Sequence, residues 1–414
     1  MTIKNFLTLI VTVAVFSLSA KDYIITDYGV QSDSTLRSTE AIQKVIDLAE
    51  TEGGGTIIFP KGTFLSGALF FRPNTKLELQ EGAKLKGSDD IADYPYIPSR
   101  MEGKSIYYYA ALVNAYQVDG FSITGPGKID GNGLKFWKAF WQRRAENPKC
   151  TNLEVSRPRM LFIWGCNDVV IRNVKLHNAG FWTTHLYQCN NVLIEGCDIR
   201  SPHEPIKAPS TDAVDIDVCK NVTVRGCYIA VNDDAIVMKG GKGPTAHEEY
   251  ENGTVENVLV EDCTFGFVHA TLTMGSECIH AKNITMRNCV VDHDKLLLRL
   301  KIRPDTYQLY EDITVESITG RCENIIYAYS WKQFFNMEGM EARPNCTIRN
   351  ITMKNIDVEC DYIGTVKGKP EDTFENIVLE NINLKVNKEA FEISEGADIH
   401  IENMKVNGKE YSLE

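Results

Sequence analysis

Long apolar runs are scarce in this chain of 414 residues. A pronounced run, Phe6–Phe16, lies near the N-terminus and is too short to span a bilayer. Lys4 precedes it, and small residues including Ser17 and Ala20 follow. This order of charge, apolar stretch and small residues is typical of a secretory signal peptide. We therefore expect residues 1–20 to direct export, to the periplasm or the exterior, and we expect no membrane span.

Basic residues are also in short supply, because 44 Lys and Arg face 56 Asp and Glu and the formal net charge is −12. This excess of negative charge argues against nucleic acids and anionic membrane surfaces as partners. It also means that any site for an anionic ligand must be locally basic. No Pro- or Ser-rich linker and no low-complexity stretch divides the remainder. We therefore expect one domain over residues 21–414, although that length is unusual for one ordinary core.

Cysteine pairs with the spacing of zinc ligands are absent, and no Cys/His cluster occurs in the sequence. We therefore expect no metal and no cofactor. Twelve cysteines are nevertheless present. In an exported chain they would ordinarily indicate disulfides.

A short phrase recurs along the chain: Asn or Asp, then Val or Ile alternating with other residues. Its copies begin at Asp168, Asn191, Asn221, Asn257, Asn283, Asp312, Asn350, Asn376 and Asp398. Each copy has the period-two alternation of a short strand, and no clear helical segment separates the copies. Repeats of this kind stack as coils, with inserts forming loops on one side. The repeat predicts an all-β fold, a right-handed parallel β-helix.

Cysteines occupy a fixed place in this repeat. The sixth residue after each start is apolar or Cys: Val174, Cys197, Cys227, Cys263, Cys289, Ile318, Ile356, Ile382 and Met404. Cys166, Cys189 and Cys219 form a second row two residues before their starts. Since Cys interchanges with Val, Ile and Met, we predict mostly free thiols buried as small hydrophobic groups.

A helix is expected before the repeats. Ser38 or Thr39 can cap a helix that runs through Glu50. Its apolar residues Ile42, Val45, Ile46 and Ala49 fall on one face. Such a helix would cover the open end of a β-helix, where apolar core and a strand edge are exposed. We predict a short N-terminal capping helix.

Charged residues gather on one strand of four successive coils. Aligning Val214, Ile236, Leu272 and Leu298 as inward-facing residues sets the register. Strand alternation then directs two rows outward, Asp215, Thr273 and Arg299 in one and Asp217, Lys239, Gly275 and Lys301 in the other. In the same register Asp212 neighbours Asp234 and Asp233 neighbours His269. Adjacent coils are only about 4.8 Å apart, so these residues should lie together.

Glycoside hydrolysis uses such a set of side chains. It needs a protonated carboxyl that donates to the leaving oxygen and a second carboxylate that activates water. Crowding of Asp212, Asp233 and Asp234 would keep one of them protonated. Arg299 and Lys301 offer donors to a sugar carboxylate. Singly, an Asp-Asp pair is typical of a solvated turn, and a lone His or strand Lys is usually structural. Their occurrence in matching rows favours a site.

The order of these segments resembles that of glycoside hydrolase family 28, the polygalacturonase family. Its N-T-D, D-D, G-H-G and R-I-K segments correspond here to Ser210–Asp212, Asp233–Asp234, Val268–Ala270 and Arg299–Lys301. The phrases GGGTIIFPKGTF, GPGKIDGNG and GFWTTHL also look like those of bacterial members.

This resemblance implies an inverting hydrolase that cleaves a pectic polysaccharide containing galacturonic acid. Asp233 would be the general acid, and Asp212 and Asp234 would hold the attacking water. His269 would tune the acid or hold the sugar. Arg299 and Lys301 would bind the substrate carboxylate, with Lys239 as a further substrate-binding candidate. Tyr327 or Tyr329, one coil beyond, would stack on the next sugar or pack in the core.

Two departures from the family pattern bear on the substrate. Ser210 replaces Asn, and Val268 and Ala270 replace the glycines beside the histidine, which predicts a bulkier site floor. A branched or rarer pectic linkage, such as that of rhamnogalacturonan, therefore stays open. The insert from Gly240 to Glu256 is expected to form a wall that restricts the enzyme to chain ends.

Two other classes of protein remain alternatives. A β-helix lyase would cleave uronates by elimination with Ca²⁺, which clusters of Asp can bind. A non-catalytic β-helix would only bind glycans. For the hydrolase we expect a monomer whose partner is a pectic polysaccharide or oligosaccharide.

Overall fold

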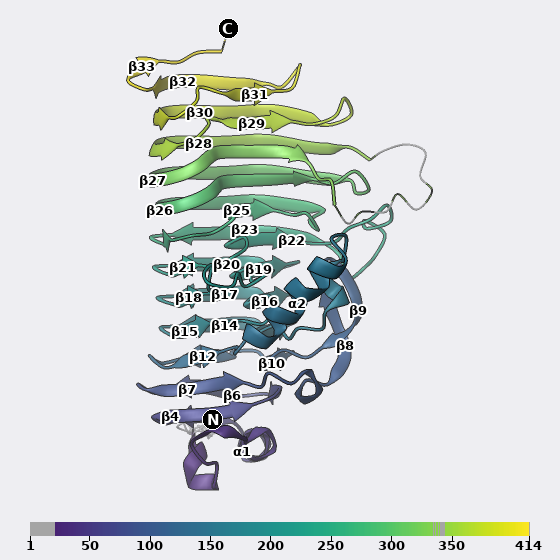
Figure 1. Ribbon diagram of the computed structural model, residues 1–414, viewed down its shortest axis with the longest axis vertical. Coiled ribbons are helices and arrows are strands. Elements are labelled where there is room, and N and C mark those ends of the chain that lie inside the picture. The colour runs from purple at the N-terminus through teal and green to yellow at the C-terminus, as the bar shows by residue number, and fades with distance from the viewer. Residues whose placement is uncertain (1–20, 334, 336, 338, 340–343, 414) are drawn as a thin grey trace, which may run out of the picture.

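The computed structural model describes residues 21–333, 335, 337, 339 and 344–413. The chain winds into a tall stack of coils, a parallel β-helix. Figure 1 shows the N-terminal coils at the bottom of the stack and the C-terminal coils at the top. Its coils take the right-handed sense that parallel crossover connections almost always adopt. The predicted fold class is confirmed. The expected signal peptide, residues 1–20, lies outside the described residues. Within them, no helix is long and apolar enough to cross a membrane.

Each coil contributes up to three strands, and equivalent strands of successive coils pair in parallel. The first column contains β5 (Leu69–Phe71), β10 (Val113–Tyr116), β13 (Leu161–Trp164), β16 (Thr184–Tyr187), β19 (Val214–Asp217), β22 (Ile236–Lys239), β25 (Ala270–Met274), β29 (Gly364–Lys367) and β31 (Phe391–Ile393). The second contains β1 (Asp22–Ile24), β3 (Gly55–Phe59), β6 (Thr75–Leu79), β11 (Ser122–Thr124), β14 (Asn167–Arg172), β17 (Asn190–Glu195), β20 (Lys220–Arg225) and β23 (Thr254–Glu261). The third contains β2 (Asp33–Arg37), β4 (Gly62–Ser66), β7 (Ala83–Gly87), β12 (Lys128–Asp130), β15 (Lys175–His177), β18 (Asp198–Arg200), β21 (Tyr228–Ala230) and β24 (Thr264–Phe265).

In the C-terminal coils the columns merge into long, bent strands. These are β26 (His280–Ile302), β27 (Gln308–Ser330), β28 (Cys346–Cys360), β30 (Thr373–Val386) and β32 (Ile399–Val406). Strands β26 and β27 pass through all three columns, and their last residues continue the first column. The short strand β33 (Lys409–Glu410) pairs with β32 in antiparallel fashion.

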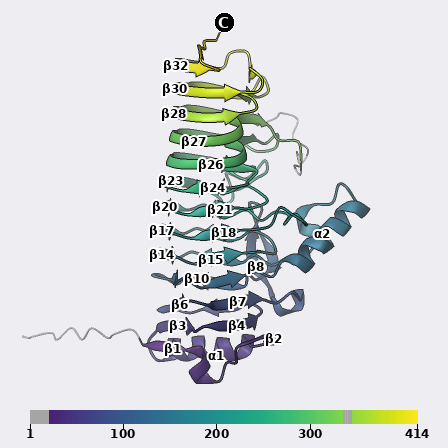
Figure 2. The same cartoon turned by 60° about the vertical axis from the view of Figure 1, so that its left-hand side comes forward.

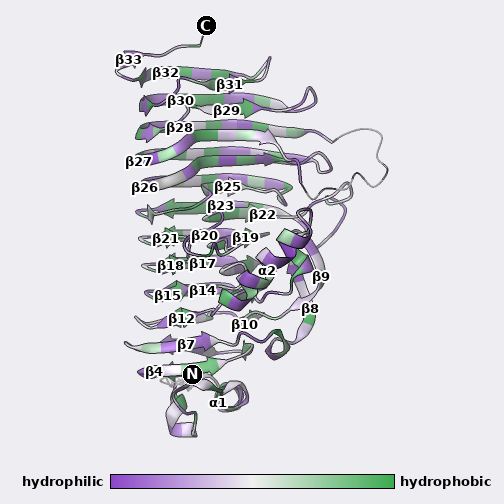
Figure 3. Ribbon diagram, in the orientation of Figure 1, coloured by the Kyte–Doolittle hydropathy of each residue, from purple (hydrophilic) through white to green (hydrophobic). Residues whose placement is uncertain are grey.

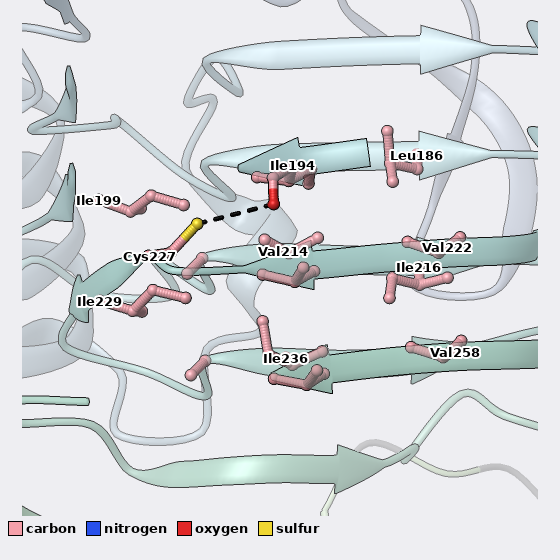
Figure 4. Packing of buried hydrophobic residues seen from close by; sticks show 14 of the residues in the cluster. Leu186, Ile194, Ile199, Val214, Ile216, Val222, Cys227, Ile229, Ile236 and Val258 are labelled. Atoms are coloured by element: carbon pink, nitrogen blue, oxygen red, sulfur yellow. Dashed lines mark hydrogen bonds between the residues drawn. The ribbon is translucent and has the colours of Figure 1, made fainter. Parts of the chain in front are cut away.

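Alternating side chains fill the interior of the coils. Hydrophobic and hydrophilic residues alternate along the strands (Figure 3). Val214, Ile216 and Ile236 lie in the continuous hydrophobic core, packed between successive coils (Figure 4). Cys227 lies in the same core and directs its thiol toward the carbonyl oxygen of Ile194, 3.8 Å away (Figure 4). The buried face of each strand therefore stacks on that of the next coil.

The polar residue that begins each repeat also has a structural role. Asn221, Asn257 and Asn283 have left-handed backbone angles, with φ of 56°, 59° and 54°. Asn adopts this conformation more readily than most residues. Their side-chain amides also bond from coil to coil, Asn257 to Asn221 at 2.9 Å and Asn283 to Asn257 at 2.6 Å. The repeated Asn thus turns the chain between columns and ties the coils together.

Both cysteine rows lie inside the coils. Cys166, Cys189, Cys197, Cys219, Cys227, Cys263 and Cys289 are free and buried. The prediction of buried thiols in these rows is confirmed.

The N-terminal cap is also as predicted. Helix α1 (Thr39–Thr51) lies beneath the first coils with Ile42, Val45, Ile46 and Ala49 buried (Figure 2). Ser38 occupies the N-cap position, but its side chain makes no capping hydrogen bond. Apolar burial, rather than the cap, therefore holds this helix in place.

Two elements were not predicted from the sequence. Helix α2 (Leu134–Glu146) projects from the side of the stack (Figure 2) and buries Phe136, Trp137 and Phe140 at its base. A hairpin of β8 (Tyr96–Met101) and β9 (Lys104–Tyr109) leaves the N-terminal coils and runs along the stack (Figure 1). The described part of the chain also contains three short 3₁₀ helices: η1 (Ile25–Tyr28), η2 (Ile91–Asp93) and η3 (Asn152–Glu154).

Candidate active site

The first column of strands has the register expected from its apolar residues. Val214 pairs with Ile236, Ile236 with Leu272, and Leu272 with Leu298. Asp212, Asp233–Asp234 and His269 therefore occupy the turns that enter β19, β22 and β25, and Arg299 and Lys301 follow on β26. Backbone hydrogen bonds between adjacent coils set the positions of these turns along the stack. Ala213 N donates to Asp234 O at 3.1 Å, and His269 N donates to Asp233 O at 3.0 Å.

Asp234 is the most strongly paired of the three aspartates. Lys301 Nζ lies 2.7 Å from Asp234 Oδ2, and Arg299 Nη1 lies 3.2 Å from Oδ1. Burial acts to raise the pKa of Asp234, but the charges of Lys301 and Arg299 outweigh it and hold that pKa well below its usual range. Asp234 is therefore ionised across the pH range in which proteins work.

Asp233 is the aspartate most open to solvent. Its side chain is 30 % exposed and lies 3.6 Å from His269 Nδ1, and that ring is 32 % exposed. Burial acts to raise the pKa of Asp233, but the nearby His269 outweighs it, and the pKa lies below its usual value. Both side chains are therefore partly accessible from the surface.

Asp212 belongs to a buried group organised around Lys239. Lys239 Nζ lies 4.0 Å from Asp212, 3.4 Å from Asp215 and 3.3 Å from Glu277. It also lies 4.5 Å from the ring centre of Trp182. Only 3 % of Lys239 is exposed, so it lies beneath the site rather than on its surface.

One ammonium group cannot neutralise both buried aspartates, Asp212 and Asp215. Burial, together with the charge of Asp233, raises the pKa of Asp212 well above its usual range. Burial also raises the pKa of Asp215 to about 7, although Lys239 opposes this. By contrast, the charges of Lys239, Lys242 and Arg303 outweigh burial at Glu277 and lower the pKa of that group. The site therefore retains a carboxyl proton near neutral pH.

Buried arginines support the site from below. Arg157 is fully buried, with its guanidinium 4.4 Å from the ring centre of Phe140 and 4.2 Å from that of Phe181. It donates to Pro209 O at 2.6 Å and to Ser210 Oγ at 3.3 Å, which fixes the turn that carries Asp212. Sequence reasoning missed this residue because its partners lie about fifty positions away.

The two residues that replace glycines beside His269 are both hidden from solvent. Val268 and Ala270 are both fully buried, and Val268 packs in the hydrophobic core. Val268 therefore points into the coil and adds no bulk to the surface of the site at that position.

Toward the N-terminal coils the site is covered. Arg100 of β8 forms a fully buried ion pair with Asp217, with Nε and Oδ2 3.0 Å apart. The hairpin turn contacts the predicted wall through two further ion pairs, Glu102 with Lys242 at 3.3 Å and Lys104 with Glu249 at 2.6 Å. The β8–β9 hairpin and the insert after Gly240 thus close this side together.

Toward the C-terminal coils the site is open. Arg299 pairs with Tyr327 and Lys301 with Tyr329 in the strand register. The two tyrosine rings stack with centres 6.0 Å apart. With Trp331 these four residues line a cavity of about 180 Å³. Within the described residues, no group of His, Cys, Asp and Glu is arranged to hold a metal ion.

Comparison with known proteins defines the class. Clustered aspartates on a parallel β-helix are suited to glycoside hydrolysis, which uses a pair of carboxyl groups. A model of the family described as "Glycosyl hydrolases family 28" matches residues 56–396, and the chain belongs to this family. Membership decides against the two alternatives left open by the sequence, a lyase and a non-catalytic glycan-binding protein.

Named relatives agree with this assignment. The chain is 24 % identical to a probable polygalacturonase of Vitis vinifera, over 89 % of this chain and 75 % of that protein. It is 26 % identical to an exo-poly-α-D-galacturonosidase of Dickeya chrysanthemi, over 68 % of this chain and 52 % of that protein. The solved exopolygalacturonase of Thermotoga maritima superposes with a TM-score of 0.82 at 22 % identity, covering 94 % of this chain and 93 % of that one.

Replacing Asp212 with Asn should stabilise the fold at neutral pH. Because the pKa of Asp212 is raised in the folded state, the folded chain keeps a proton that the unfolded chain releases above about pH 3.9. Stability is therefore lost as the pH rises from that value toward the folded pKa. Asn removes this loss, so calorimetry should give a higher Tm at about pH 7, by about 1 °C or more for each kcal/mol gained. The Tm difference should nearly vanish at about pH 4. A lower Tm for the variant at about pH 7 would contradict the raised pKa.

Proposed function

We propose that this protein is an exported hydrolase of pectic polysaccharide that cleaves at galacturonic acid residues. Residues 1–20 would direct export and residues 21–414 would form a single catalytic domain acting as a monomer. The proposal rests on one observation: the three aspartates lie on the same strand column as Arg299 and Lys301. Acid/base groups are thus next to cations, although the chain has a net charge of −12. The names of the relatives support the same substrate class.

Asp233 is the general acid in this proposal, since it is the aspartate that a leaving oxygen can reach. An incoming uronate removes water from Asp233 and brings a negative charge close to it, and both effects raise its pKa. The site's retained proton can then lie on Asp233 while Asp212 and Asp234 orient a water molecule. Attack by that water on the face opposite the leaving oxygen inverts the sugar configuration. His269, 3.6 Å from Asp233, would position the acid or the sugar.

Arg299 and Lys301 recognise the carboxylate of the sugar. Each side chain donates one hydrogen bond to Asp234. Each has further N–H groups for the sugar carboxylate, because a guanidinium has five donors and an ammonium three. Arg299 is 21 % exposed at its side chain and Lys301 is 11 % exposed, so Arg299 is the more accessible of the two. Lys239 acts on the reaction through Asp212 in this scheme rather than by touching the substrate, which revises its expected role.

The covered N-terminal side supports action at chain ends. Asp215, Asp217 and His185 occupy outward-facing rows of the column, yet all are fully buried under the hairpin and its surroundings. A polymer therefore has room to continue past the site only toward Arg299 and the coils beyond. We infer that the enzyme releases short products from one end of the chain.

Loss of the acid should abolish turnover without unfolding the protein. Asp233→Asn should lower kcat on a galacturonide by about 10²–10⁴-fold, the usual contribution of general acid catalysis. Asp212→Asn and Asp234→Asn should be comparably severe, and the three losses should not add. Asp262→Asn is the matched control, because Asp262 is exposed and its left-handed φ of 55° suits Asn. Retention of more than about a tenth of the activity by Asp233→Asn would refute its role.

Arg299 should select for a free carboxylate. A hydrogen bond to a charged group is worth about 1.5–3 kcal/mol, so Arg299→Gln should lower kcat/KM on the acidic substrate by about ten- to a hundred-fold. The loss on the methyl-esterified substrate should be much smaller. Arg299→Lys keeps a positive charge beside Asp234. A loss of kcat/KM in this variant therefore reflects substrate recognition rather than a changed pKa of Asp234. Equal losses on both substrates would remove the physical basis for the uronate assignment.

Chain-end action should be visible in the products. At early times an oligogalacturonide should give only the short released product and chains that are shorter by that one step. Chromatography at early times tests this. A mixture of intermediate lengths at the start of the reaction would show that chains pass through the site, which the buried Arg100–Asp217 pair should prevent.

A further inference from the structure

Beyond Arg299 and Lys301 the open side of the site divides into two branches that share Tyr329 and Lys332. The first branch is a cavity of about 640 Å³. Its lining includes Trp331, Lys367, Lys369 and Glu395. The second is a cavity of about 360 Å³. Its lining includes Glu323, Tyr362, Thr365 and Glu392. A substrate that continues past the site can follow either one.

The two branches differ in charge. The first has three lysines, including the shared Lys332, and one glutamate. The second has two glutamates and only the shared Lys332. In a protein with a net charge of −12, a concentration of cations next to the site is unusual. An anionic chain is drawn toward the first branch and repelled from the second.

The first branch also continues the strand column that carries the site. Lys301 pairs with Tyr329 and Tyr329 with Lys367, so these side chains occupy one row on three successive coils. Lys301 and Lys367 are thus two strand spacings apart, about 10 Å. Tyr329 lies between them, and Lys332 Nζ lies 4.6 Å from its ring centre. The row offers cation, aromatic ring and cation in sequence.

We propose that the first branch is a second uronate-binding subsite, in which Lys367 and Lys369 hold a carboxylate of the substrate chain beyond the one at Arg299 and Lys301. The proposal rests on the proposed function. Tyr329 and Trp331 line this branch and offer aromatic surface to the intervening sugars. Lys367 is paired with Glu392 at 3.1 Å, and both side chains are about half exposed, so this pair can open at little cost. The substrate carboxylate replaces Glu392 at Lys367.

The test is the dependence of rate on chain length. For the double variant Lys367→Ala/Lys369→Ala, kcat/KM on pentagalacturonate divided by kcat/KM on digalacturonate should fall about ten-fold, the size of one charge-assisted hydrogen bond. Glu392→Gln removes the competing carboxylate and should raise the same ratio. Lys385→Ala is the matched control, since Lys385 is also exposed and paired with a glutamate, Glu359, at 3.1 Å but lies outside both branches.

An unchanged ratio in the double variant, or a fall of equal size in Lys385→Ala, would overturn the subsite. If the wild-type protein cleaves neither substrate, the proposed function is wrong, and calorimetry with pentagalacturonate then tests the subsite alone. In that case the double variant should bind about ten-fold more weakly than the wild type. Equal affinities would overturn the subsite independently of the reaction.

Discussion

Parallel pairing between successive coils is the constraint on which the rest of this structure depends. Each strand of the first column pairs residue by residue with the next, so that Val214, Ile236, Leu272 and Leu298 stack inside. The polar residues beside them are then held about 4.8 Å apart on the outer face. Four segments spread over nearly ninety residues thereby become one site without a long loop to position any of them. A slip of one residue in the register of a single coil would point the polar side chains of that coil into the core.

Within this frame, the distribution of cations decides which carboxyl groups are ionised. Asp234 has both Arg299 and Lys301, whereas Asp212 and Asp215 share Lys239 with Glu277, which also pairs with Arg303. The first arrangement lowers the pKa of Asp234 against the effect of burial. The second leaves the pKa of Asp212 raised by burial and by Asp233. Such separated pKa values cost stability, and they are characteristic of sites that move protons.

Much of the fold and of the site could be predicted from the sequence by a simple rule. In a β-helix, residues at equivalent positions of successive repeats become neighbours on adjacent coils. The apolar rows fixed the register, and the register placed Asp212, Asp233, Asp234, His269, Arg299 and Lys301 together. The N-terminal cap followed from one amphipathic helix. The Cys rows followed from their exchange with Val and Ile.

The parts that could not be predicted lie outside this rule. Arg100 and Asp217 are separated by 117 positions, and no periodicity relates them. For the same reason, Asp215 and Lys239 point away from the coil as expected, yet they are buried. Facing outward from a coil is not the same as facing solvent once a hairpin covers the surface. The one-sided opening of the site therefore emerged only from the structure.

The reaction itself can be tested by following a solvent oxygen atom. The protein should be incubated with a defined oligogalacturonide in water labelled with heavy oxygen, and the first products should be weighed by mass spectrometry. Hydrolysis through the three aspartates predicts one labelled oxygen for each bond cleaved, attached to the new reducing end. Unlabelled products containing a carbon–carbon double bond would show elimination instead and would contradict the account.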